Sequence, residues 1–207
     1  MKDTIFIPGK ELLDHFEKNG LIVAPVNIFE VSFVDMFNNI KAPNNFNTKK
    51  RQFSTQPLTG TEIKITPYKG TKSLLMRTII NSDSGKQYQT SIMFTRVKYV
   101  DDIEDVDDPN SIVEFMASDG EEYAIERIDL KKNDVKVRCE CLDFRWRFAD
   151  YNASKKALYG RKPPPYVPKG NRPPVNPNHV PGVCKHLIKS FEIMMESGLT
   201  TMENTNV

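Results

Sequence analysis

The sequence predicts an α+β fold, in which a β-rich N-terminal part precedes a small C-terminal module with a long proline-rich insertion. Segments that alternate apolar and polar side chains dominate residues 61–139, which is typical of strands. All three cysteines and one histidine form two tight pairs on either side of a proline-dense stretch. We therefore place the β-rich part, with a short first helix, at residues 1–120, the module at 121–198 and a tail at 199–207.

The N-terminal segment predicts two helical stretches around a short extended one. In residues 10–18, apolar side chains recur at helical spacing before a glycine that can end the helix. Residues 21–34 are apolar and rich in β-branched side chains, which indicates one or two short strands, and a helical turn is expected at residues 33–40. The polar residues 44–56 predict a loop.

Strands dominate the next eighty positions or so, because the period of the apolar residues changes to about two. Glycine-containing turns follow the second and the fourth expected strand, which predicts two hairpins. The expected strands are residues 61–65, 73–80, 87–99, 112–116, 122–130 and 134–139.

An acidic run interrupts these strands, with six Asp or Glu among the eight residues 101–108. Such a run is expected to be a solvated loop. A calcium site is the alternative, although the ligand rhythm and the glycine of an EF-hand loop are absent.

Charge is divided unevenly along the chain, although the formal net charge is only +2. Residues 131–189 hold 14 Lys and Arg against 4 Asp and Glu, a balance of +10, whereas the remainder has a balance of −8. This asymmetry favours an anionic partner for the basic part, or attraction between the two parts, over chance scatter in a small protein.

A metal site is predicted from the pattern C-x-C, 42 residues, C-x-H, which uses every cysteine of the chain. Cys139 and Cys141 lie two positions apart at a strand end, so both side chains can point to one face. Cys184 and His186 begin a segment with apolar residues at helical spacing. Three thiolates and one imidazole form a closed tetrahedral set for one zinc ion per chain, with no open position for catalysis.

Three alternatives to a zinc site stay open for this pattern. They are ordinary buried cysteines beside a surface histidine, an iron–sulfur cluster, and a catalytic Cys184–His186 pair. The first leaves the clustering of all three cysteines unexplained, and the last lacks a third group to orient the histidine. The odd number of cysteines argues against a disulfide framework.

The two pairs resemble the SWIM-type zinc finger, whose motif is C-x-C, a variable gap and C-x-H on a ββα unit. The similarity covers about residues 130–196, because residues 135–137 resemble the strand before the first pair and residues 142–144 the acidic–aromatic step after it. The resemblance implies a zinc-knit ββα module that binds DNA or protein. The gap between the pairs is longer than this family leads us to expect.

This gap predicts a helix followed by an extended arm. Aromatic residues recur at helical spacing from Phe144, which predicts a helix at residues 143–159. Eight of the 14 prolines fall in residues 163–181, which excludes helix and interior strand and favours a polyproline-type arm. Because zinc ligands would hold both of its ends, we interpret the arm as a contact element and not as a passive linker.

The same region is also similar to uncharacterised tailed-bacteriophage proteins, and the chain's richness in Asn and Lys fits an AT-rich genome. This similarity implies a viral protein. It rests on Cys139, Phe144, Arg145, Arg147, Phe148, Pro181, Gly182 and His186.

Two functions from different classes follow from these observations. The first is a non-enzymatic, zinc-stabilised module that contacts nucleic acid or a protein partner through its basic half, with aromatic side chains that can stack on bases. The alternative is a structural or assembly protein of a phage virion, in which the arm docks on a neighbouring subunit of a homo- or hetero-oligomer. The expected contact residues are Arg145, Arg147, Lys155, Lys156, Arg161, Lys162, Tyr166, Lys169 and Arg172.

An enzyme is not expected. The sequence lacks a phosphate loop, a nucleophile elbow, a paired-carboxylate signature and an open metal site. No stretch approaches the length of a membrane helix and no signal peptide is evident, so we expect the protein in the cytoplasm or in a phage particle assembled in the host cytoplasm.

Overall fold

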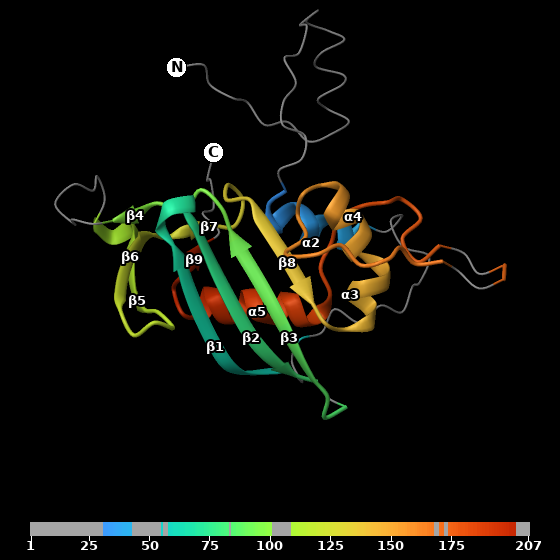
Figure 1. The fold of residues 1–207 in the computed structure, drawn as a ribbon, viewed down its shortest axis with the longest axis horizontal. Helices are drawn as coiled ribbons and strands as arrows, with labels where there is room; N and C mark the ends of the chain where they lie inside the picture. Colours follow the sequence, from blue (N-terminus) through green and yellow to red (C-terminus); the bar gives the residue numbers. More distant parts are fainter. Residues whose placement is uncertain are drawn as a thin grey trace, which may run out of the picture.

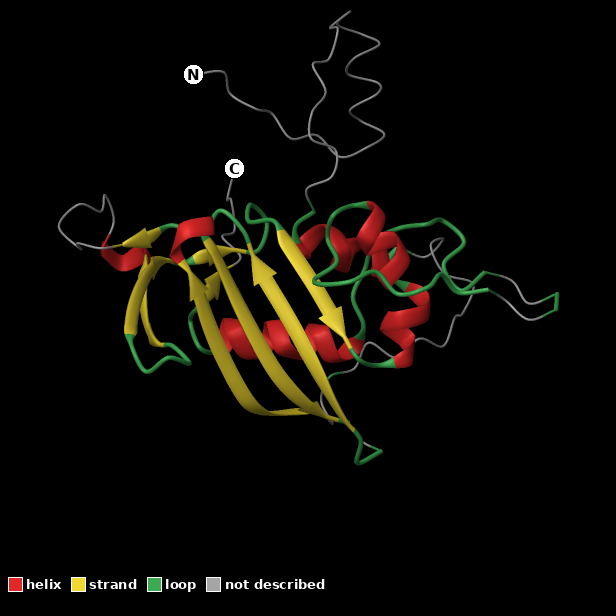
Figure 2. Cartoon of the chain, in the orientation of Figure 1, coloured by secondary structure: helices red, strands yellow, loops and turns green. Residues whose placement is uncertain are grey.

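A computed structural model of the chain describes residues 31–42, 55, 58–82, 84–100, 109–167, 170–171 and 174–201. The helix expected at residues 10–18 and the acidic run at 101–108 lie outside these ranges, as do most of the segments 21–34 and 44–56. Antiparallel sheets and a few helices make up the described part, which confirms the predicted β-rich α+β fold (Figure 2).

A four-stranded antiparallel sheet with the order β1-β2-β3-β8 forms the centre of the fold (Figure 1). Its strands are β1 (Thr59–Tyr68), β2 (Ser73–Asn81), β3 (Gln87–Phe94) and β8 (Val135–Cys139). The hairpin of β2 and β3 was predicted, whereas the pairing of β8 with β3 joins residues that are far apart in the sequence. Strands from both sides of residue 120 therefore share one sheet.

Smaller elements extend this sheet at the β1 side and at its ends. A second sheet with the order β4-β6-β5 contains the second predicted hairpin, and β7 pairs in parallel with β9. The expected strand at 87–99 ends at Phe94 because Arg96 has a left-handed backbone with φ of 59°. The short strands are β4 (Tyr99–Val100), β5 (Ile112–Met116), β6 (Glu122–Glu126), β7 (Ile128–Asp129) and β9 (Thr200–Thr201), and the 3-10 turns are η1 (Lys69–Thr71) and η3 (Pro109–Ser111).

Helix α5 (Lys185–Glu196) covers one face of the sheet and completes the core. Met76, Ile92 and Val137 are paired across three strands and are at most 2% exposed on this face. A buried hydrogen bond of 2.7 Å between the Thr90 and Ser190 hydroxyls fixes the helix against β3, and Thr90 also donates to the carbonyl of Thr78. The polar pair is satisfied within an apolar core, so it sets the position of α5 on the sheet without leaving an unpaired group.

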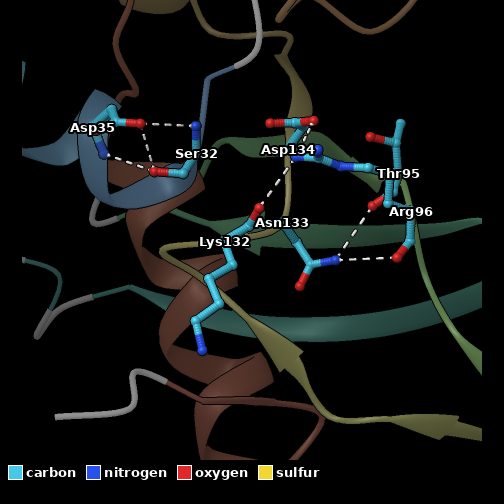
Figure 3. A network of polar contacts seen from close by, with 7 residues as sticks. All are labelled: Ser32, Asp35, Thr95, Arg96, Lys132, Asn133 and Asp134. Carbon is cyan, nitrogen blue, oxygen red and sulfur yellow. Dashed lines mark hydrogen bonds and ion pairs between the residues drawn. The ribbon is translucent and has the colours of Figure 1, made fainter. Parts of the chain in front are cut away.

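Two separate segments pair with the outer edge of β8, which leaves no long free edge on that strand. Ser32 forms an antiparallel bridge with Asp134, and Leu158 forms a parallel bridge with Val137. Ser32 also begins α2 (Phe33–Lys41), the helix expected at 33–40, through a capping box with Asp35. Figure 3 shows this cap beside the contacts that join residues 132–134 to the end of β3, including the 2.5 Å ion pair of Arg96 and Asp134.

The helix expected at residues 143–159 is wrong in its length and continuity. The structure has two short helices, α3 (Leu142–Arg147) and α4 (Ala149–Ser154), which meet at the fully buried Phe148. Helix α4 ends at Ser154, and the chain turns at Lys156, whose φ is 55°. The amide of Val137 then donates to the carbonyl of residue 157, and the carbonyl of Val137 accepts from the amide of residue 159. Strand pairing along β8 therefore replaces the last helical turns that aromatic spacing predicted.

Phe191 connects α5 to both α2 and the sheet, so its truncation should destabilise the whole fold. Its ring centroid lies 3.6 Å from that of Phe33 and 6.1 Å from that of Phe94, and its side chain is 1% exposed. Phe191→Ala should lower the free energy of unfolding by about 3–5 kcal/mol, measured by denaturant titration at fixed metal concentration. Met195→Ala on the same helix, where the side chain is 39% exposed, should change it little; equal effects of both variants would contradict this core assignment.

Candidate metal centre

Four side chains from three elements converge at the end of the sheet. Cys139 is the last residue of β8 and pairs with Thr90, so its side chain lies on the face that α5 covers. Cys141 is the N-cap of α3, and Cys184 is the N-cap of α5 with His186 in the first turn. A strand end and two helix starts thus bring together the residues that the C-x-C and C-x-H pairs predicted.

The distances within this cluster fit one metal ion. The four ligand atoms all lie within 4.8 Å of one another, and all four residues are buried. His186 Nδ1 lies 3.8 Å from the sulfur of Cys139 and 4.0 Å from that of Cys184. A tetrahedral zinc ion with metal–sulfur bonds of about 2.3 Å places its ligands roughly 3.7 Å apart. The residues therefore form one group that can hold a single metal ion.

Hydrogen bonds and burial act in opposite directions on the three thiols. Burial raises the pKa of Cys139 and of Cys184. Hydrogen bonds from these two thiols, together with the amide of Phe144, lower the pKa of Cys141. Of the three thiols, Cys141 is therefore the one that ionises most readily, and a bound cation would displace the protons that burial favours on Cys139 and Cys184.

The imidazole of His186 is oriented by its packing. Its Nδ1 faces the sulfurs, and its ring lies against Tyr88 with 4.5 Å between ring centroids. Its Nε2 is buried and has no hydrogen-bond partner among the described residues. One turn later, the hydroxyl of Ser190 lies 3.1 Å from the carbonyl of His186 and 2.7 Å from the hydroxyl of Thr90, so it joins this turn to the sheet.

Gly182 and the buried side-chain amide of Asn152 position the backbone that leads to Cys184 and His186. The side chain of Asn152 forms two hydrogen bonds with the backbone of Gly182, of 3.0 and 2.9 Å. A Cβ at residue 182 would lie 2.6 Å from Phe148 and 2.7 Å from Ile40, so only glycine fits between α2 and α4. This close approach positions the backbone two residues before Cys184.

A second buried amide anchors the proline-rich segment. Asn176 is fully buried, donates to the carbonyls of Arg147 and Val180 and accepts from the amide of Val180. Nearer its start, Lys162 pairs with Asp150 at 2.8 Å, and the ring of Tyr166 lies 5.8 Å from that of Trp146. The segment is therefore attached to α3 and α4 near both of its ends, while Val167 between them is 76% exposed.

A basic cleft of about 750 Å³ lies beside the Cys/His cluster, between the end of β8, the helices α3 and α4 and the start of the proline-rich segment. Its walls combine four cations with apolar surface and one carboxylate, Glu140. The cations are Arg138, Arg145, Arg161 and Lys162, and the apolar walls come from Phe144, Ala149, Pro163, Pro164 and Pro165.

The predicted contact residues are dispersed by the fold. Arg145, Arg161 and Lys162 line the cleft, whereas Lys155 and Lys156 follow the end of α4 and do not line it. Arg147 is 18% exposed and pairs with Asp143 at 3.1 Å, which makes it part of the α3 scaffold. Lys169 and Arg172 lie outside the described residues.

Sequence reasoning did not assign a role to Arg138, Asn152 or Asn176. Arg138 alternates with buried residues on β8, a pattern that indicates a strand and not a site. The two amides are recognisable only once the topology brings residue 152 to Gly182 and residue 176 to Arg147. The one local feature of the sequence that indicated a close approach here was Gly182, two positions before Cys184.

Comparisons of the chain with protein-family models, with curated proteins and with solved structures found no match. None of the described helices has the length and apolar character that crossing a membrane requires.

The cluster should bind one metal ion per chain, measured by elemental analysis of the purified protein. Binding by the metal-free protein at neutral pH should release about two protons, because Cys139 and Cys184 must both ionise; calorimetry in buffers of different ionisation enthalpy measures this number. Affinity should therefore fall as the pH is lowered. His186→Ala should lose the ion and His179→Ala, outside the cluster, should keep it; retention of the ion by both variants would refute the assignment of this ligand.

Gly182→Ala should destabilise the protein and weaken metal binding together. The added methyl group must displace Phe148 or Ile40, which costs about 1–3 kcal/mol in the free energy of unfolding. Gly70→Ala is the matched control, because a Cβ there meets no atom within 4 Å. Thermal unfolding and a metal competition assay measure the two effects, and a Gly182→Ala protein equal to the Gly70→Ala control would show that the close approach is not needed.

Proposed function

We propose that the chain is a non-enzymatic, zinc-stabilised module that binds nucleic acid through the basic cleft beside its metal centre. The observation that carries the proposal is the juxtaposition of Arg138, Arg145, Arg161 and Lys162 around one hollow next to Cys139. The resemblance to SWIM-type zinc fingers, which bind DNA or protein, supports it.

Zinc is the metal that suits the donor set. Three thiolates and one imidazole are soft and borderline ligands, which favour zinc over calcium or magnesium. Phe144 and Cys141 donate backbone amides to the sulfurs of Cys141 and Cys139, at 3.3 and 3.5 Å, and such bonds stabilise thiolates. With four protein ligands the ion has no position for water or substrate, so its role is structural.

The chemistry of the cleft favours a phosphate-bearing partner. Guanidinium groups bind phosphate oxygens in a bidentate manner, and three of the four cations are arginines. Phe144 and the three consecutive prolines give the same hollow apolar walls, against which a base or a sugar can pack. Arg145 also lies over the ring of Trp146 at 4.6 Å, which keeps its guanidinium beside an aromatic face.

A second candidate is an assembly protein of a virus particle, and exposed apolar side chains favour it. Val167 in the proline-rich segment is 76% exposed, and Leu142 at the start of α3 is 65% exposed. Such side chains can anchor a protein neighbour, and prolines lower the entropy lost on docking.

Neutralising the cleft should weaken binding to nucleic acid. Arg145→Gln combined with Arg161→Gln should lower the affinity for a labelled oligonucleotide in fluorescence anisotropy, and the slope of log affinity against log salt should fall by about 0.7–0.9 for each phosphate that is no longer neutralised. Lys41→Gln combined with Lys98→Gln removes the same charge from α2 and from the loop before β4, and should have little effect. Wild-type protein that does not bind at about 50 mM salt would refute the nucleic-acid proposal, and a concentration-dependent rise in mass by light scattering would then favour assembly.

A further inference from the structure

A row of cations crosses the face of the central sheet that α5 does not cover. Lys64 on β1 pairs with Arg77 on β2, Arg77 pairs with Ser91 on β3, and Ser91 pairs with Arg138 on β8. Directly paired residues in antiparallel strands project to the same face of a sheet. The register therefore aligns three cations and one hydroxyl across all four strands.

This row lies on the open side of the sheet. Its neighbours along the strands, Met76, Ile92 and Val137, point to the other face and are buried beneath α5. The side chain of Lys64 is 60% exposed and Arg77 and Arg138 are half-buried, whereas Ser91 between the two arginines is only 5% exposed. In Figure 1, α5 passes behind the four strands, and no described helix crosses in front of them.

The open face has an excess of positive charge. Its charged residues on the four strands are the cations Lys64, Arg77, Lys136 and Arg138 and a single carboxylate, Glu62. Glu62 pairs with Lys64 at 2.6 Å at the edge of the sheet, and Glu140, the residue after β8, accepts from the amide of Gln89. Four cations against these two carboxylates still leave the face an excess of two positive charges.

The row is continuous with the basic cleft. Arg138 belongs to both surfaces, and its guanidinium donates to the carbonyls of Tyr159 and Arg161. Arg77 donates to the hydroxyl of Tyr159 at 3.2 Å, so the same tyrosine links the two arginines of the sheet. From Arg138 the positive surface passes directly to Arg161, which is exposed at the mouth of the cleft.

We propose that the open sheet face and the cleft form one track for a single strand of nucleic acid, which deepens the proposed function and depends on it. Between β1 and β8 the row spans three strand spacings, about 14 Å, which is the length of a few nucleotides. A single strand is flexible enough to follow a flat face and then turn into a hollow of about 750 Å³. A duplex is too stiff and too wide to make that turn.

The test compares two pairs of substitutions on the full chain with its metal, using a labelled oligothymidylate. Lys64→Gln with Arg77→Gln removes two cations of the row, and should lower affinity roughly tenfold or more at about 50 mM salt and reduce the salt slope by about 1.4. The cleft pair Arg145→Gln with Arg161→Gln should act similarly, and the control pair Lys41→Gln with Lys98→Gln should not. Equal metal content and melting temperature confirm that each variant is folded.

A variant that adds charge tests the track in the opposite direction. Gln89 is exposed on the same face of β3, two positions from Ser91, and Gln89→Lys should raise affinity and steepen the salt dependence. If the cleft pair weakens binding while the row pair and Gln89→Lys match wild type, the track is overturned and the proposed function stands. If wild-type protein binds no oligonucleotide, both are overturned. Tighter binding of duplex DNA or of polyglutamate than of oligothymidylate would overturn the single-strand assignment.

Discussion

The convergence of Cys139, Cys141, Cys184 and His186 is the constraint on which the other features of the fold depend. Three buried thiols and a buried imidazole, joined by weak hydrogen bonds alone, are costly to remove from water, and a bound metal ion would convert that cost into a net stabilisation. The cluster fixes the end of β8 against the start of α5, so the helix that covers the sheet is held at its first turn. It also closes the base of the 42-residue segment that forms the basic cleft.

Local patterns were enough to predict the Cys/His cluster and the hairpins. The clustering of the three cysteines with His186 was predicted because all cysteines of the chain fall in two spaced pairs. The β2–β3 and β5–β6 hairpins were predicted because turn residues separate alternating runs. The pairing of β8 with residues 157–159 could not be predicted in this way. Its hydrogen bonds join positions about twenty residues apart, and they outcompete the helical spacing of Phe144, Phe148 and Tyr151.

The basic residues of the cleft and of the sheet face could not be predicted from local patterns either. The contact residues were predicted from the high density of basic residues in this part of the sequence, but their neighbours in the fold give them different roles. Arg147 forms an ion pair with Asp143, whereas Arg145 lines the cleft. Arg77 and Arg138 looked like ordinary outward positions of strands, because a sequence does not reveal strand register. Only the pairing through Ser91 brings them into one row.

The order of α5 after the sheet has a consequence for synthesis on the ribosome. The chain emerges from its N-terminal side at about 5–20 residues per second, and 45 residues separate the end of β8 from the start of α5. The apolar face with Met76 and Ile92 therefore stays uncovered for several seconds, until the helix that buries it has been synthesised. During that interval the nascent strands expose a hydrophobic surface that chaperones and other chains can bind. Cys139 and Cys141 are then present without Cys184 and His186, so only half of the metal-binding group exists.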